Sequence, residues 1–132
     1  MAEILTVLHI LMIPKSYDLY LTTGLRHTEF KCRCSRKTCT HTLVVDKLRT
    51  AYGNLRTSVG FPLEINSGFR CQMHNAEVGG SSSSSHMTGH AIDISTKNLN
   101  MDEFEVLLEQ SKIHFDVVII YETFIHCHME GK

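Results

Sequence analysis

Two residues in one short segment, His86 and Asp93, carry the clearest chemical signal in the sequence. They lie in Ser84-Ser-His86-Met-Thr-Gly-His-Ala-Ile-Asp93-Ile94, where a histidine follows a serine run and a carboxylate lies between isoleucines. A charged group with apolar neighbours is costly to bury unless it is paired or bound to a cation. Zinc accepts both imidazole nitrogen and carboxylate oxygen, so the two residues suit a zinc site. The alternative is that Asp93 faces solvent on a half-exposed strand, and the spacing does not decide between the two.

A second set of candidate residues lies in Glu122-Thr-Phe-Ile-His126-Cys-His128. Side chains alternate between the two faces of a strand, which places both histidines on one face and Glu122 at the same parity in the preceding turn. Catalytic zinc sites use three protein ligands and keep a position for water, whose proton a nearby carboxylate accepts. His86, Asp93 and one of the two histidines, with Glu122 as the base, meet this requirement. Taken alone, the two histidines would be ordinary strand residues with satisfied hydrogen bonds.

Together with Ser67-Gly-Phe-Arg70 and Phe115-Asp116, the motif S-x-H-x-x-G-x-A-x-D-I resembles the zinc D-alanyl-D-alanine carboxypeptidase family, peptidase family M15. The resemblance extends over residues 30–126, roughly three quarters of the chain. Members include carboxypeptidases and endopeptidases that act on peptidoglycan, among them phage endolysins, and they share their metal-site fold with the hedgehog signalling domain. The resemblance therefore implies a zinc metallopeptidase that cleaves amide bonds in peptidoglycan stem peptides.

The resemblance also assigns roles to single residues. It implies that His86 and Asp93 bind Zn²⁺ and that Arg70 is catalytic, polarising the scissile carbonyl or holding a substrate carboxylate through its planar donors. The third ligand corresponds to His126 in the family's usual ending, whereas members with an H-x-H pair use the second histidine, here His128. The segment I-H-C, which also occurs in the hedgehog domain, favours His126.

The position of the catalytic base depends on the choice of the third ligand. Relatives carry an acidic residue three or six positions before the ligand, and Glu122 lies four before His126 and six before His128. If the spacing of six applies, His128 is the ligand and His126 a neighbouring proton carrier. If His126 is the ligand, we expect His128 to bind the substrate, together with Arg70 and Ser84.

Cys32, Cys34 and Cys39 cluster with His41 in one segment. They supply enough soft ligands for a second, structural zinc, and some relatives carry a similar cysteine-bearing segment. The spacing C-x-C-x4-C-x-H is not a standard zinc motif, so free or partly paired thiols are the simpler interpretation. The total of five cysteines is odd and the other two stand alone, which favours a reducing compartment over a secreted disulfide framework.

Helices are predicted where apolar residues recur every three to four positions. The pattern predicts an amphipathic helix within 43–59, ended by Gly60, and a short helix over 71–78. Asn100 followed three residues later by Glu103 is typical of a capping pair that opens another helix.

Alternating apolar residues predict short strands. The expected strands cover residues 63–66, 91–94, 115–121 and 124–129, the last two joined by a tight turn. Residues 30–41 and the serine run 81–85 are expected to be loops. The order of elements predicts an α+β fold, a small and mainly antiparallel sheet flanked by helices, like that of hedgehog and D-Ala-D-Ala peptidases.

Length and composition limit the partners. A chain of 132 residues with 42% hydrophobic residues predicts one domain over 1–132, and we expect a monomer. The net charge is −1 with acidic and basic residues mixed, so no nucleic-acid partner is expected. The apolar stretch 4–14 is too short to cross a membrane and follows Glu3 instead of basic residues, which predicts a core segment and neither a membrane anchor nor a signal peptide. This pattern is compatible with two routes to the cell wall. The protein could be made in the cytoplasm and released as phage lysis enzymes are, or it could have carried an export signal that has been trimmed.

Two other functions compete with a peptidase. A hedgehog-like binding module would keep the zinc without cutting any peptide, although such a module needs neither Glu122 nor Arg70. A metal-free domain would leave Asp93 and its motif unexplained. Within the peptidase hypothesis, D,D-carboxypeptidase and L,D-endopeptidase activities both remain open, because loops at the ends of the cleft decide between them.

Overall fold

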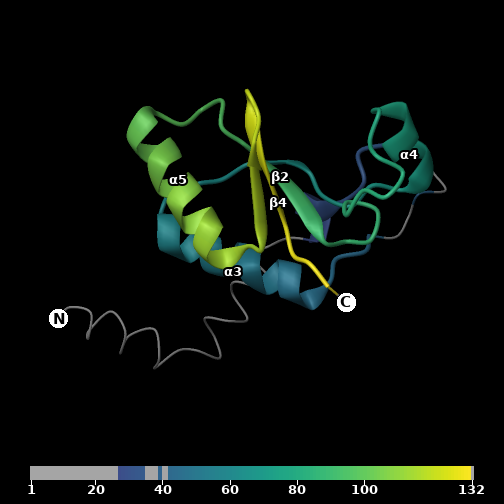
Figure 1. The fold of residues 1–132 in the computed structure, drawn as a ribbon, viewed down its shortest axis with the longest axis horizontal. Coiled ribbons are helices and arrows are strands. Elements are labelled where there is room, and N and C mark those ends of the chain that lie inside the picture. The colour runs from purple at the N-terminus through teal and green to yellow at the C-terminus, as the bar shows by residue number, and fades with distance from the viewer. Residues whose placement is uncertain (1–26, 35–38, 40–41, 132) are drawn as a thin grey trace.

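The computed structural model describes residues 27–34, 39 and 42–131 of the chain, and the predicted core segment 4–14 lies outside these ranges. The elements follow one another along the chain as shown in Figure 1. They are η1 (His27–Phe30), α3 (Asp46–Val59), β1 (Ile65–Ser67), α4 (Gln72–Glu77), β2 (Ala91–Ser95), α5 (Met101–His114), β3 (Val117–Ile120) and β4 (Phe124–His128). The predicted α+β fold is confirmed, and each predicted helix and strand is present with its ends moved by no more than a few residues.

The four strands form one antiparallel sheet in the order β1-β2-β4-β3. In its interior β2 pairs with β4, with Asp93 opposite His126 and Ile92 opposite Cys127. The first strand begins at Ile65 instead of residue 63, and a register shift follows Ile65 in its pairing with β2. This shift leaves Ser67 opposite Asp93.

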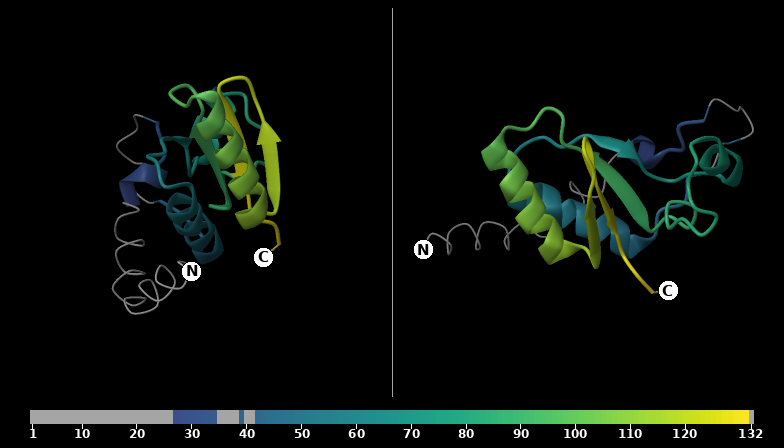
Figure 2. Two further views of the ribbon diagram at one scale, coloured as in Figure 1. Left: turned by 90° about the vertical axis from the view of Figure 1, so that its left-hand side faces the viewer. Right: turned by 45° about the horizontal axis from the view of Figure 1, so that its top comes forward.

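One face of the sheet carries the hydrophobic core. On this face, alternate residues of β2 and β4, such as Ile92 and Ile125, are fully buried. They pack among apolar side chains of α3 and α5, including Leu55 and Leu107. Figure 1 shows α3 and α5 crossing each other at one end of the molecule and α4 at the other end, and Figure 2 gives two further views of these helices beside the sheet. Because successive side chains alternate, residues of the opposite parity on β2 and β4, among them Asp93, point to the other face.

The ends of the two long helices are defined by local hydrogen bonds. In α5 the Asn100 side chain accepts from the backbone N–H of Glu103 at 2.8 Å, and Glu103 accepts in return from the backbone N–H of Asn100 at 3.0 Å. This capping box confirms the predicted pair. Helix α3 ends at Gly60, whose left-handed backbone (φ 76°) lets its N–H donate to the carbonyl of Arg56.

The core predicts a strong dependence of stability on Leu107. Leu107→Ala empties a fully buried position and is expected to lower the free energy of unfolding by about 3 kcal/mol. Ile113→Ala, on the same helix but with its side chain 64% exposed, is the matched control and is expected to change it by less than about 0.5 kcal/mol. Urea unfolding followed by circular dichroism measures both values, and equal losses would contradict this description of the core.

Candidate metal centre

A tight loop before β2 brings His86 into the interior. The Ser84 hydroxyl accepts a hydrogen bond from the backbone N–H of His86 at 3.1 Å, so this serine fixes the turn in which the histidine lies. Gly89 has φ 78°, and a Cβ atom there would lie 2.5 Å from the carbonyl oxygen of Leu43. Only glycine fits this close approach without strain. The predicted loop is thus a compact turn that leaves His86 only 2% exposed.

Three side chains from separate elements converge on one point of the sheet. His86 Nε2 lies 3.2 Å from Asp93 Oδ1, and His126 Nδ1 lies 3.0 Å from the same oxygen. The ligand atoms of all three residues lie within 4.8 Å of one another. In a tetrahedral zinc site with bonds of about 2.0–2.1 Å, neighbouring ligand atoms are roughly 3.3 Å apart. The two measured separations are close to this value.

The hydrogen bond of His86 Nδ1 determines whether the other ring nitrogen, Nε2, presents a proton or a lone pair to Asp93. His86 Nδ1 lies 2.7 Å from the backbone carbonyl of Gly68. A carbonyl only accepts, so Nδ1 carries the proton and, in a neutral ring, Nε2 presents a lone pair to the carboxylate oxygen. Two acceptors at 3.2 Å repel each other unless a proton or a metal ion lies between them. The donor set of two imidazoles and one carboxylate therefore fits zinc.

Burial and hydrogen bonding shift the pKa of Asp93 in opposite directions. Its low exposure would by itself raise the pKa of the carboxyl group, but when the facing nitrogens of His126 and His86 carry protons, their hydrogen bonds and charge lower this pKa to about 2. A bound metal ion would take the place of these protons. The carboxylate is therefore ionised throughout the neutral range. This is the form that a metal ion requires.

His128 lies behind His126 rather than beside Asp93. Its Nδ1 is 2.8 Å from His126 Nε2, and its Nε2 is 3.7 Å from a carboxylate oxygen of Glu130. Burial and the neighbouring His126 lower the pKa of His128, which favours its neutral form. A neutral His128 accepting from His126 Nε2–H leaves the Nδ1 lone pair of His126 directed at Asp93. Orientation of this kind, by a partner on the far ring nitrogen, is typical of metal-binding histidines.

Arg70 packs directly against the Asp93 carboxylate. Its Nη2 lies 3.4 Å from Asp93 Oδ2, while Nε and Nη1 donate to Ser67 Oγ and Asn75 Oδ1, each at 3.1 Å. Asn75 is itself buried and donates to the carbonyl of Ser81 at 2.8 Å. Sequence analysis identified the arginine but missed Ser67 and Asn75 as the side chains that fix its guanidinium plane.

Glu122 lies in the turn that joins β3 to β4 and is exposed. The hairpin is closed by the backbone N–H of Tyr121, which donates to the carbonyl of Phe124 at 2.9 Å. Directly opposite His126 on β3 stands Ile119, which carries no group able to transfer a proton. Among the described residues, the group of possible metal ligands around Asp93 does not include Glu122.

Two pockets each include one residue that contacts the converging side chains. One has a volume of about 500 Å³ and is lined by Arg70, Met87 and residues of α4. Another, of about 470 Å³, is lined by His90, His128 and residues of the serine loop. Arg70 contacts Asp93 and His128 contacts His126, so each pocket is linked to the converging set through one of its lining residues.

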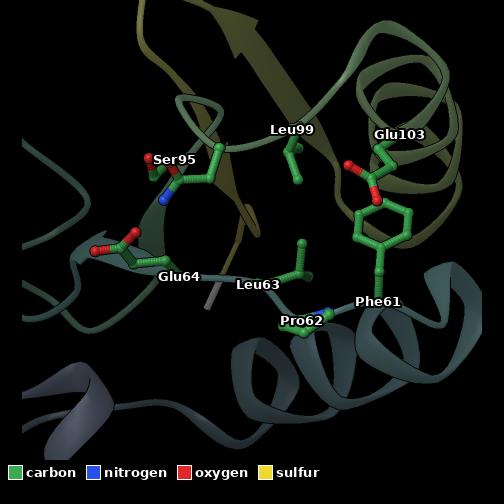
Figure 3. A pocket seen from close by; sticks show the side chains of 8 residues that line it. Phe61, Pro62, Leu63, Glu64, Ser95, Leu99 and Glu103 are labelled. Carbon is green, nitrogen blue, oxygen red and sulfur yellow. The ribbon is translucent and has the colours of Figure 1, made fainter.

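A further pocket, shown in Figure 3, is lined by none of the residues that converge on Asp93. It measures about 320 Å³ and lies between Phe61 and Leu99, away from the residues that converge on Asp93. Two of its polar groups have local partners: the carboxylate of Glu103 closes the capping box, and Ser95 Oγ accepts from the backbone N–H of Lys97. These partners leave it without a convergent polar site.

Comparison with protein families places the chain in a known class. The family model described as Peptidase M15 matches residues 23–128, so the chain belongs to the peptidase M15 family. This match confirms the resemblance found in the sequence and supports metallopeptidase activity at the level of the family. No curated protein matches the chain. Within the residues that the structure describes, no helix has the length and apolar character needed to span a membrane.

The metal centre predicts that zinc affinity depends on the histidine behind the ligand. His128→Ala is expected to weaken zinc binding at this centre by about 10–100-fold, because His126 loses the partner that orients its ring. Competition titration with a chromophoric chelator measures this affinity. His90→Ala is the control, since His90 bonds Thr88 and is not among the converging residues; equal losses in both variants would contradict the assignment.

Proposed function

We propose that the chain is a zinc-dependent peptidase that cleaves amide bonds in peptidoglycan stem peptides. The observation that carries the proposal is the convergence of His86 Nε2, His126 Nδ1 and Asp93 Oδ1, two of whose separations are 3.2 and 3.0 Å, in a member of the peptidase M15 family. The resemblance of the motifs to peptidoglycan-cleaving relatives supports the substrate class. The donor set supports zinc over harder cations, which prefer oxygen ligands.

The three converging side chains would hold the ion and leave one position open towards the substrate. Zinc held there would supply a Lewis acid for an amide carbonyl and would lower the pKa of a water molecule towards 7. Arg70 adds a fixed positive charge next to this position, because Ser67 and Asn75 hold its guanidinium in one plane. A planar donor group fixed in this way suits a substrate carbonyl or carboxylate.

Glu122 is the proposed general base. Phe124 and His126 are two positions apart on β4, about 7 Å along the strand, and Glu122 precedes Phe124 in the turn. Its side chain would reach the metal position through a bridging water, an accepted geometry for proton transfer. The proton then passes from Glu122 to the amine that leaves.

Two separate pockets, each with a lining residue that contacts the converging side chains, favour cleavage within a peptide over removal of a terminal residue. A stem peptide crossing the metal position would extend into the pocket beside Arg70 on one side and the pocket beside His128 on the other. We therefore propose L,D-endopeptidase activity ahead of D,D-carboxypeptidase activity. Digestion of purified sacculi followed by mass spectrometry distinguishes release of a fragment of two or more residues from release of D-alanine alone, and D-alanine as the only released fragment would reverse this order.

A zinc-containing binding module without turnover is the second candidate function. The observation that favours it is the position of Ile119 opposite His126, where a proton-transferring residue would be closest to the metal. In that case the chain would bind peptidoglycan fragments and zinc but release no product.

If Glu122 is the base, its replacement should lower turnover and leave zinc binding unchanged. Glu122→Gln is expected to keep its zinc and to lose about 10²–10⁴-fold in the rate of muropeptide release, because an amide cannot accept the proton. Glu109→Gln, the same change on the exposed side of α5, is the matched control and should keep the wild-type rate. A wild-type rate in Glu122→Gln would transfer the role to another residue, and zinc-loaded wild type without product would favour the binding module.

A further inference from the structure

A second cluster of ligands lies outside the His86–Asp93–His126 centre. The sulfur atoms of Cys32, Cys34, Cys39 and Cys71 all lie within 4.8 Å of one another. The sequence suggested His41 as the fourth member, but His41 is outside the described residues, and Cys71, which seemed isolated, occupies the fourth place. Cys71 comes from the residue that precedes α4, so the cluster joins two distant segments of the chain.

We propose that these four cysteines bind one structural zinc ion as a tetrathiolate site. Cys71 Sγ lies 3.9 Å from Cys34 Sγ. In a tetrahedral site with Zn–S bonds of about 2.3 Å, neighbouring sulfurs are roughly 3.8 Å apart. A disulfide would bring them to about 2.05 Å. The separation therefore matches ligands of a common ion.

Backbone N–H groups point at the sulfurs as they do around metal-bound thiolates. The N–H of Cys71 donates to Cys32 Sγ at 3.3 Å, and the N–H of His74 donates to Cys71 Sγ at 3.4 Å. These hydrogen bonds stabilise negative charge on sulfur, the form that binds metal. Four thiolate ligands select a soft ion such as zinc over magnesium or calcium.

The surrounding charge suits such a site. Four thiolates and one Zn²⁺ leave a net charge of −2. Basic residues alternate with Cys32 and Cys34 in the sequence and can offset part of that charge. They are Lys31 and Arg33.

The position of the cluster indicates what the ion would stabilise. Cys71 directly follows Arg70, and Cys32 lies two residues after Phe30. Phe69 N–H donates to the carbonyl of Phe30 at 2.8 Å, and a Cβ atom on Gly68 would lie 2.7 Å from the Phe30 Cα. The two backbones are already in close contact there. A zinc ion between them would hold the segment that carries Arg70, without contacting the substrate.

The test is zinc stoichiometry in a background where the first centre is removed. Protein expressed with zinc and purified under reducing conditions is analysed for metal by mass spectrometry. We expect two zinc ions in wild type, one in His86→Ala, and none in His86→Ala with either Cys34→Ser or Cys71→Ser. His86→Ala with Cys127→Ala is the matched control and keeps one, because Cys127 is buried in the core away from the cluster. These counts do not depend on turnover, so the proposal stands or falls separately from the peptidase activity.

A measurement without cysteine substitution covers the case in which those variants do not fold. Titration of His86→Ala with a mercurial reagent should release its zinc as the thiols react, and cobalt substitution should produce the intense sulfur-to-cobalt charge-transfer absorption of a thiolate site. Folded His86→Ala without zinc, iron in place of zinc, or a mass lowered by the four hydrogens lost in two disulfides would each overturn the proposal.

Discussion

The pairing of Asp93 with His126 across β2 and β4 is the interaction on which the rest of the structure depends. It places a carboxylate in the interior of the sheet, a position that is costly unless opposite charge surrounds it. Arg70 supplies opposite charge beside the carboxylate, and the two histidines place ring nitrogens at which a proton or a metal ion can add more. The same pairing fixes the register of the sheet, because it sets Ile92 and Cys127 on the opposite face among the helices. The candidate metal ligands and the hydrophobic core therefore lie on opposite faces of the same pair of strands.

Much of this arrangement was predictable because it depends on local patterns. The spacing of Leu48, Tyr52 and Leu55 predicted α3, and the Asn100–Glu103 pair predicted the start of α5. Alternation along residues 91–94 and 124–129 predicted β2 and β4, although the true ends differ by a residue. His86, Asp93 and His126, the ligand set implied by the family resemblance, lie together in the structure, and their role as metal ligands stays a prediction.

What sequence analysis missed depends on contacts between distant segments. Cys71 joins Cys34 across 37 positions, and no periodicity links the two. Ser67 and Asn75 lie only three and five positions from Arg70, but their side chains meet its guanidinium through the path of the chain between β1 and α4, which no repeating pattern in the sequence predicts. The position of Glu122 was ambiguous for a different reason. Counting residues from the ligand cannot give a spatial position when the intervening turn has an unknown length, and here the turn is tight enough to leave Glu122 at its tip.

The strand order has a consequence for the way the protein is made. β4 follows every other described strand in the chain, yet it lies between β2 and β3 in the sheet. A nascent chain that reaches only residue 123 therefore has no partner for the inner edge of β2, and it lacks both Ile125 in the core and the histidine opposite Asp93. Folding must wait for these late residues, since long-range strand pairing sets the pace of such topologies. The arrangement of His86, Asp93 and His126 consequently cannot form during synthesis before β4 has joined the sheet.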